Sequence, residues 1–247
     1  MNSETPPNRR NSSRVKLALL TLFVLPILIS LGVWQLNRAA EKEALDQQYH
    51  TQQQLPPVAL DAEILAQLSD FRRIVAEGKF DGDHTWLLDN KQRGGRVGFE
   101  VISPFQLSDG TWLLVNRGWI AGTGQRDQLP AIPQLSGTQT LFGQIVSLSH
   151  HPLLDASAQT DEWPRIIMAL DTWAMSAQLE RPLANRIVQL DEASPGALTT
   201  DWQPIPLSAT KHRGYAFQWF AMALALCIWF VVVNTNLLHT WRSSRQK

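Results

Sequence analysis

LALLTLFVLPILISLGVWQL (residues 17–36) and FQWFAMALALCIWFVVVNTNLL (residues 217–238) are the stretches of sequence that decide the fold. Neither contains Asp, Glu, Lys or Arg. A helix of such a length is about 30 Å long, which matches the hydrocarbon thickness of a bilayer. The sequence therefore predicts two transmembrane helices, over 17–36 and 214–240. The alternatives are a cleaved signal peptide for the first stretch and a buried helix of a soluble protein for the second.

Charged residues are distributed unevenly around these two stretches. The chain has 247 residues with 22 Lys+Arg and 22 Asp+Glu, so its formal net charge is zero. Residues 1–16 carry four basic side chains and one acidic, and residues 241–247 carry three basic and none acidic. The intervening segment, 38–213, carries 15 basic and 21 acidic side chains. Because short positive flanks stay on the inner side, both tails are expected in the cytoplasm and the segment 37–211 in the periplasm.

The same distribution indicates a compartment and excludes one class of partner. The N-terminal tail lacks the amphipathic, arginine- and serine-rich length of a mitochondrial presequence, which favours the inner membrane of a bacterium. The net negative charge of the outer segment argues against nucleic acid as a partner. The lipid bilayer is therefore the expected environment of the two apolar stretches.

Residues 37–211 are expected to form one α+β domain built mainly of antiparallel strands. Short runs rich in β-branched and aromatic residues alternate there with clusters of Gly, Asp and Pro. The predicted strands are Phe71–Phe80, Thr85–Asp89, Val97–Ser103, Thr111–Ile120, Thr138–Leu148, Arg165–Leu170 and Asn185–Leu190. Ser108-Asp109-Gly110 is the clearest hairpin signal among their connections.

Three helical segments are predicted beside these strands. The first transmembrane helix is expected to continue through polar residues to Gln54 and to end before Pro56-Pro57. Asp61 and Asp171 are expected to cap the N-termini of two short helices, the second over Thr172–Glu180. The predicted fold class is thus a membrane protein in which two transmembrane helices flank one mainly antiparallel extracytoplasmic domain.

Few residues could carry catalysis or bind a metal ion. The single cysteine, Cys227, excludes an intramolecular disulfide and a multi-cysteine metal site. The sequence contains no H-E-x-x-H, no G-x-S-x-G and no phosphate-binding glycine loop. His150-His151 is expected in a loop, and Asp81-Gly82-Asp83-His84 is more typical of a turn than of a metal site. The sequence therefore favours a protein that is not an enzyme.

His212 is the most informative histidine, because it lies where the outer domain enters the second predicted span. Tyr215, Ala216 and Trp219 follow at i+3, i+4 and i+7, on one helix face. A neutral imidazole is a good axial ligand of haem iron, and aromatic rings can pack on a porphyrin. The flanking cations of Lys211 and Arg213 could pair with haem propionates. The alternative is an interfacial belt, in which these residues only fix the depth of the helix.

Four blocks of sequence, in this order, resemble motifs of the Surfeit-locus family of cytochrome oxidase assembly proteins. They are Leu31-Gly32-Val33-Trp34-Gln35-Leu36-Asn37-Arg38; Gly94-Gly95-Arg96-Val97-Gly98-Phe99 with Ser103-Pro104-Phe105; Val115-Asn116-Arg117-Gly118-Trp119-Ile120; and Lys211-His212-Arg213-Gly214-Tyr215-Ala216 with Gln218-Trp219-Phe220. The resemblance covers nearly the whole chain.

The resemblance implies an assembly factor for haem–copper (cytochrome c) oxidase that assists delivery of haem a to, or its insertion into, the large catalytic subunit. It implies that subunit as a partner, with haem a synthase as a further one. His212 is the implied haem ligand, and Tyr215, Trp219 and Arg213 are the candidate residues beside it. The motif residues Trp34, Gln35, Arg38, Arg117, Gly118 and Trp119 are candidates for partner contact or structural roles.

Two other functions stay open at this point. A haem-free membrane scaffold could stabilise an assembly intermediate of the oxidase by helix and domain contacts alone. An envelope sensor or receptor would share the same layout, but the short tail after Trp241 makes a cytoplasmic output domain less plausible. The three hypotheses differ most sharply in what they require of His212.

Overall fold

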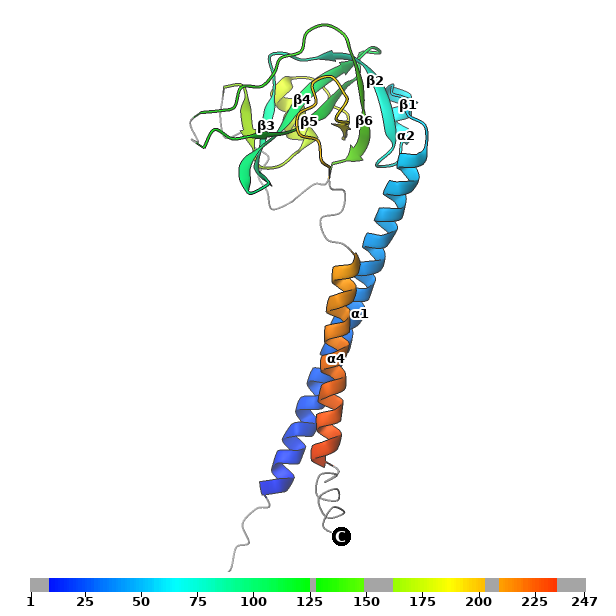
Figure 1. Ribbon diagram of the computed structural model, residues 1–247, viewed down its shortest axis with the longest axis vertical. Coiled ribbons are helices and arrows are strands. Elements are labelled where there is room, and N and C mark those ends of the chain that lie inside the picture. The colour runs from blue at the N-terminus through cyan, green and yellow to red at the C-terminus, as the bar shows by residue number, and fades with distance from the viewer. Residues whose placement is uncertain (1–8, 125–127, 149–161, 203–208, 235–247) are drawn as a thin grey trace, which may run out of the picture. The chain divides into compact units, whose positions relative to one another are not determined.

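The computed structural model describes residues 9–124, 128–148, 162–202 and 209–234. The chain divides into two compact units. The helical unit comprises Met1–Asp46 and Ile205–Lys247, and the barrel unit comprises Gln47–Pro204. Figure 1 labels the helices of the first unit and most strands of the second. The barrel unit therefore contains fewer residues than the segment 37–211, which is predicted to lie outside the membrane.

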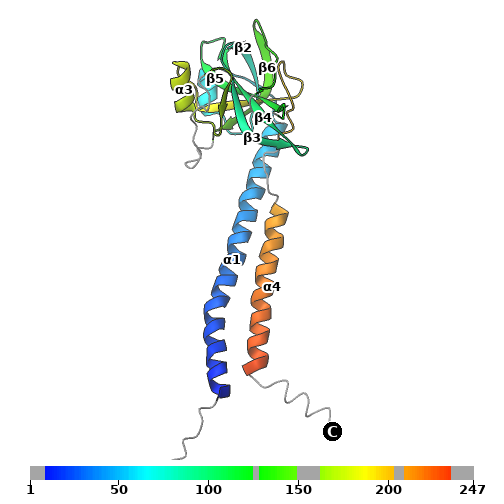
Figure 2. The same cartoon turned by 90° about the vertical axis from the view of Figure 1, so that its left-hand side faces the viewer.

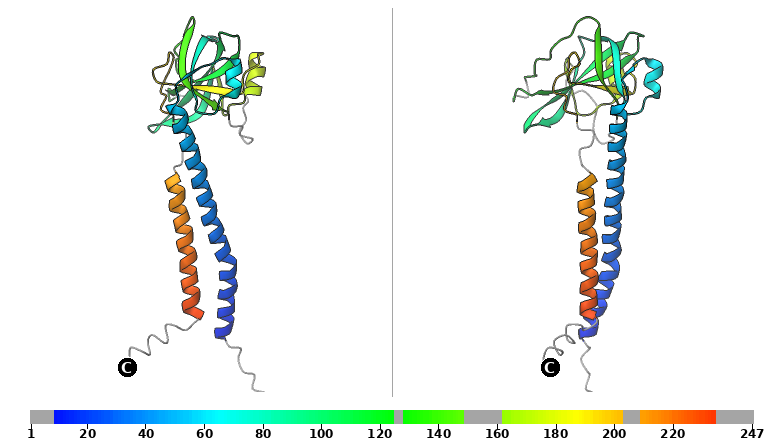
Figure 3. Two further views of the ribbon diagram at one scale, coloured as in Figure 1. Left: turned by 90° about the vertical axis from the view of Figure 1, so that its right-hand side faces the viewer. Right: turned by 45° about the vertical axis from the view of Figure 1, so that its right-hand side comes forward.

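Two helices, α1 (Arg9–Gln54) and α4 (Ala209–Asn234), account for the helical unit and lie side by side in every view (Figures 1, 2 and 3). Both are long and apolar enough to cross a membrane. Pro26 lies inside α1 without ending it, as membrane helices tolerate. Most of the large apolar side chains of the two helices are exposed, which is not the pattern of a buried helix in a soluble core.

In the described part of the barrel unit, eight strands form one mixed sheet. Their bounds are β1 (Val58–Ala59), β2 (Arg73–Phe80), β3 (Trp86–Arg93), β4 (Arg96–Leu107), β5 (Trp112–Ala121), β6 (Gln139–Ser147), β7 (Arg165–Ile167) and β8 (Arg186–Leu190). The strand order is β1-β2-β6-β8-β5-β4-β3-β7, and β2 also pairs with β4. This additional pairing closes β2, β6, β8, β5 and β4 into a barrel. The described residues of this unit also contain the end of α1 and two short helices, α2 (Ala62–Gln67) and α3 (Thr172–Leu179).

The pairing is mainly antiparallel, but three pairs are parallel: β1 with β2, β3 with β7 and β5 with β8. The register of β4 against β5 shifts between Glu100 and Ile102, and such a bulge bends a strand. The predicted hairpin is confirmed: Gly110 has a φ of 93°, and the Thr111 amide donates to Asp109 at 2.8 Å. The extra residue is on β5, where Arg117 and Gly118 lie opposite Val101 of β4, and β4 itself pairs with β5, β3 and β2.

Two apolar clusters stabilise the barrel unit. One is built mainly on the strands that close the barrel and includes Phe105, Leu141 and Ile145, each fully buried. The other lies between β3, β4, β5, β7, β8 and α3 and includes Trp86 and Met175. Because alternate strand residues point to opposite faces, the same strands supply both clusters.

The ends of the helices match the caps that the sequence predicts. Asp61 accepts the Ile64 amide at 2.8 Å, and Asp171 accepts the Trp173 amide at 2.9 Å. The continuation of the first helix to Gln54 is confirmed. In the last turns of α1, Gln53 donates to Gln144 Oε1 at 2.7 Å, so this end of the helix is anchored on β6.

Candidate functional site

The candidate site in the helical unit is the seam between α1 and α4. The buried small residues Gly32 and Ala39 on α1, and Ala216 and Ala223 on α4, are each seven positions apart. A Cβ atom on Gly32 would lie 2.6 Å from Cε1 of Phe220, so the two helices touch here. Small residues at a helix–helix contact let the backbones approach closely in a membrane. The seam therefore fixes the side chains that lie along it.

His212 and Gln35 meet on this seam. Gln35 lies between the small residues of α1, and His212 lies one turn before Ala216 of α4. The Nδ1 atom of His212 lies 2.8 Å from Oε1 of Gln35, and both side chains are half-buried. An amide oxygen only accepts hydrogen bonds, so Nδ1–H of the ring donates. The neutral imidazole then carries its lone pair on Nε2. A histidine held in this way can bind a metal through Nε2.

Two ion pairs lie close in sequence to His212 and Gln35. Arg213 donates to both carboxylate oxygens of Glu43, at 2.6 and 2.9 Å. Arg38 donates to Glu41 at 2.7 Å, and its guanidinium carbon lies 6.0 Å from the ring centroid of Trp34. Exposed pairs of this kind add little stability. The pair with Glu43 matters for the charge near His212, because it already balances the positive charge of Arg213.

The aromatic residues near His212 differ in their surroundings. Trp219 is half-buried and falls on the seam, seven positions after His212. Tyr215 is 51% exposed and lies beside the seam rather than in it. A ligand on Nε2 of His212 would therefore find an accessible phenol at Tyr215 and an indole partly held by helix packing at Trp219. Lys211 is also exposed and makes no ion pair with the described part of the chain.

Arg117 on β5 is buried in the barrel unit, with 3% of its surface exposed. Its guanidinium donates to the carbonyl oxygens of Gly196 at 2.9 Å and Pro133 at 2.8 Å, and it lies over the ring of Phe80. Burial lowers the pKa of Arg117 to about 10, so the side chain stays charged at neutral pH. These contacts join two chain segments that are far from β5 in the sequence.

Gly118 and Trp119 fix the same region through the backbone. Gly118 has a φ of 109°, and a Cβ atom there would lie 2.6 Å from the carbonyl oxygen of Thr199. The Trp119 amide donates to that oxygen at 2.8 Å, and its indole donates to the Lys91 carbonyl at 3.2 Å. The described contacts of the internal motif are therefore all inside the barrel unit.

The turn around His84 forms a small polar cluster. Asp81 lies 2.9 Å from Nδ1 of His84 and 3.3 Å from a guanidinium nitrogen of Arg181. Within the described ranges, no group of three or more His, Cys, Asp or Glu side chains is arranged to hold a metal ion. His150, His151 and His239 lie outside the described residues. The contacts of Asp81 are those of a turn tied to a neighbouring segment.

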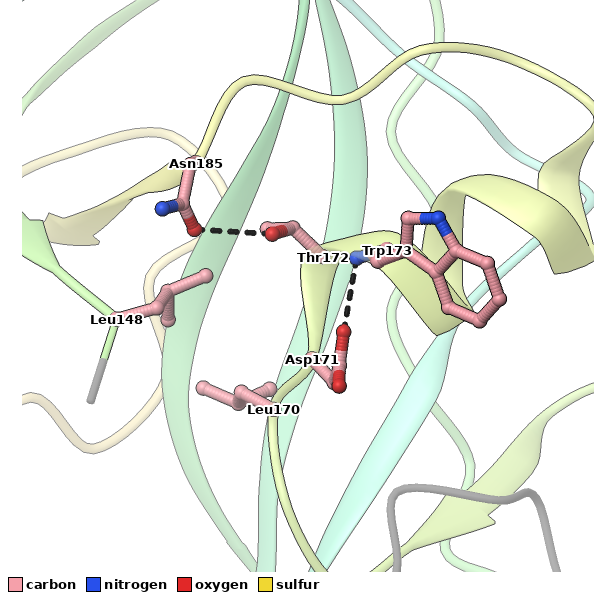
Figure 4. Close-up of a pocket in the computed structure, with 6 residues that line it drawn as sticks. All are labelled: Leu148, Leu170, Asp171, Thr172, Trp173 and Asn185. Atoms are coloured by element: carbon pink, nitrogen blue, oxygen red, sulfur yellow. Dashed lines mark hydrogen bonds between the residues drawn. The ribbon is translucent and has the colours of Figure 1, made fainter. Parts of the chain in front are cut away.

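A shallow pocket of about 390 Å³ lies beside α3 (Figure 4). Leu148 and Leu170 line its apolar part, and Thr172 donates to Asn185 at 2.9 Å across it. Trp173 lines the pocket and is 82% exposed. The exposed indole of Trp173 is a candidate contact residue, because tryptophan is enriched among the residues that carry binding energy at protein interfaces.

Sequence reasoning named His212 and Gln35 but did not pair them, and it missed Glu43. The sequence did hold a signal for this pairing, because His212 and Gln35 lie at the expected outer ends of the two spans. No comparable signal existed for the carbonyl partners of Arg117. Pro133 and Gly196 are 16 and 79 positions away along the chain, and a backbone carbonyl leaves no mark in the sequence.

The chain is similar to one family model and to individual proteins that carry the same family name. The model of the SURF1 family matches residues 22–224 of the chain. A SURF1-like protein of Rickettsia felis is 24% identical over 234 residues, which cover 91% of this chain and 99% of that protein. An uncharacterized SURF1-like protein of Mycobacterium tuberculosis is 25% identical over 199 residues, 78% of this chain and 73% of that protein.

A third relative is more similar over a shorter stretch. A SURF1-like protein of Dictyostelium discoideum is 34% identical over 112 residues, which cover 41% of this chain and 42% of that protein. The matched residues of the family model include both the Gln35 and the His212 ends of the seam.

Proposed function

The chain belongs to the SURF1 family, known generally as cytochrome oxidase assembly factors, and from this premise we propose that it assists delivery of haem a to the large catalytic subunit of the oxidase. In this proposal the haem is cargo, which the protein holds and passes on. The family is one of assembly factors rather than of recognised enzymes. No covalent step on a substrate is therefore assigned to the chain.

The observation that carries the proposal is the hydrogen bond between His212 and Gln35. Its length of 2.8 Å and its acceptor oxygen leave Nε2 of a neutral imidazole as the free nitrogen. Haem iron takes such a nitrogen as an axial ligand. The residues that follow His212 suit haem as cargo, because an accessible phenol at Tyr215 and the half-buried indole of Trp219 lie on the same helix. His212 is thus the proposed iron ligand.

Positive side chains near His212 suit the propionates of haem a. Arg213 is paired with Glu43 and is available only if that pair opens. Lys211, next to His212 in the chain, is exposed and is the more readily available cation. Charge-assisted hydrogen bonds to carboxylates are stronger than neutral ones, so either cation would orient the cargo.

The proposed orientation follows from charge. The short positive ends of the chain favour the cytoplasm for both termini, and the acidic segment between the spans favours the periplasm. The membrane that we propose for this orientation is the inner membrane of a bacterium. Reporter fusions after Lys247 and in the loop near Gly110 test this, because they should report opposite sides. The same side for both fusions would contradict it.

The exposed Trp173 favours a second function, which is a haem-free scaffold that contacts an oxidase subunit or haem a synthase. The two proposals differ in their need for His212. The test is to purify the full-length protein from a host that makes haem a and to record its absorption spectrum. Haem delivery predicts bound haem a in the wild type and its loss in His212→Ala. Oxidase co-purification without haem, undiminished in His212→Ala, would instead support the scaffold.

A further inference from the structure

We propose that Gln35 is a positioning residue that selects which nitrogen of His212 binds the iron. The inference rests on the proposed function and deepens it. The hydrogen bond joins the α1 motif to the α4 motif within the helical unit, over 177 positions of sequence. This hydrogen bond gives Gln35, on the first span, a role in the iron binding of His212, on the second span.

The chemistry of the pair determines the tautomer. A neutral imidazole has one N–H, and in solution it can be on either nitrogen. Oε1 of Gln35 has no hydrogen to give, so the ring is held with its hydrogen on Nδ1. Nε2 is thereby left with its lone pair and is the nitrogen that can bind iron. Loss of the acceptor releases this constraint.

Helix packing keeps the two side chains within reach of each other. Gly32 is three positions before Gln35, and its backbone contacts the ring of Phe220. Ala216 is four positions after His212 and is 1% exposed. Each member of the pair therefore lies about one turn from a tight contact between the helices. A side chain fixed in this way holds a ligand more accurately than one on a loop.

The neutral acceptor also sets how strongly the imidazole donates to a metal. A carboxylate at this place would draw the Nδ1 hydrogen further and make Nε2 a stronger ligand. An amide orients the ring with a smaller effect on its basicity. That property suits cargo that must be released to another protein. Gln35 is therefore suited to orient His212 without holding the haem too tightly.

The first experiment needs no haem. Full-length protein labelled with ¹⁵N-histidine is placed in lipid nanodiscs, and His212→Ala identifies the ring signals of His212. The wild type should show hydrogen on Nδ1 and an unprotonated Nε2. Gln35→Leu should lower the ratio of the Nδ1–H to the Nε2–H form about fivefold, the equivalent of one hydrogen bond. Gln35→Glu, which keeps an acceptor, should retain the Nδ1–H form.

Asn37 offers a matched control on the same helix. It is exposed, and two positions along a helix place it on the side opposite Gln35. Asn37→Leu and Asn37→Asp change polarity and charge by the same amounts as the two Gln35 variants. Both should leave the tautomer of His212 unchanged. An unchanged tautomer in Gln35→Leu would overturn the proposal.

The second experiment uses protein purified from a host that makes haem a. Gln35→Leu should lower haem affinity about tenfold or more, as loss of the partner of a metal-binding histidine commonly does. Gln35→Glu should retain the haem and lower its midpoint potential, while Asn37→Asp should leave the potential near that of the wild type. If the wild type holds no haem, the proposed function fails, whereas the tautomer still decides whether Gln35 orients the ring. Bound haem with an unchanged affinity in Gln35→Leu would contradict the positioning role alone.

Discussion

Replacing Gly118 by alanine should destabilise the barrel unit more than its backbone strain alone would. The φ of 109° at this position is in the region that L-residues rarely adopt, and it costs about 1–2 kcal/mol for a residue with a Cβ atom. The added Cβ would also lie 2.6 Å from the Thr199 carbonyl oxygen, which accepts the Trp119 amide at 2.8 Å and would have to give up that hydrogen bond to move away. Three backbone hydrogen bonds hold residues 198–199 to β5. The Trp119 amide donates to Thr199, the Thr199 amide donates to Trp119, and the Leu198 amide donates to Arg117.

The magnitude follows from these contacts. At about 1 kcal/mol for each backbone hydrogen bond, loss of the three adds about 3 kcal/mol to the strain. The total of about 4–5 kcal/mol is a large part of the stability of an ordinary domain, and it should lower the melting temperature by about 10 °C.

Gly110 provides the matched control for this prediction. Its φ is 93°, but no atom lies within 4 Å of the place that a Cβ would occupy. Gly110→Ala should therefore carry the strain without the clash and cost about 1–2 kcal/mol. Unfolding of the full-length variants in detergent, followed by near-ultraviolet circular dichroism, measures both. The reasoning is refuted if Gly118→Ala is no less stable than Gly110→Ala.

Four further changes have expected outcomes. Arg117→Lys should destabilise the barrel unit by about 2–3 kcal/mol in the same assay, because an ammonium cannot reproduce the two guanidinium bonds of a buried side chain. Hydrogen bonds from backbone amides lower the pKa of the Asp109 carboxyl below its usual value of 3.8. Its contribution to stability is therefore present above that value and is lost as the pH falls through the lower folded pKa, so Asp109→Asn should flatten the acid end of the stability profile. Trp173→Ala should change stability by less than about 0.5 kcal/mol, so a loss of oxidase co-purification would locate a partner contact, whereas normal co-purification would argue against one. Gly32→Ala should weaken haem binding by forcing Phe220 off the seam, and a second change, Phe220→Ala, should restore it in a titration with haem; failure of that rescue would show that the contact does not govern the site.

The sequence predicted most elements of the fold for physical reasons that are local. All seven expected strands exist, because alternation of β-branched and aromatic residues between turn residues is a local signal. The caps at Asp61 and Asp171 are local as well. The predicted mainly antiparallel sheet is confirmed, but its closure through β2 and β4 is a pairing of distant strands that no local pattern encodes. The parallel pairing of β5 with β8 is likewise non-local.

The candidate site was predictable in its residues and unpredictable in its geometry. His212 was identified by its position before an apolar stretch and by its neighbours, and Gln35 by a motif. Their hydrogen bond depends on the rotation of two helices about their axes, which is set by small residues such as Gly32 and Ala216. Helical spacing grouped Tyr215 with Trp219, whereas helix packing separates them by burial.

The central claim is that His212 carries haem a to the oxidase. Its most direct test is the haem a content of the large oxidase subunit, isolated from cells that lack this protein and are supplied with variants of it. The wild type should restore the haem content, and His84→Ala, a histidine change in the barrel unit, should do the same. His212→Ala at an equal protein level should leave the content close to that of cells without the protein. A full haem content with His212→Ala would contradict the claim and would favour a scaffold that acts without haem.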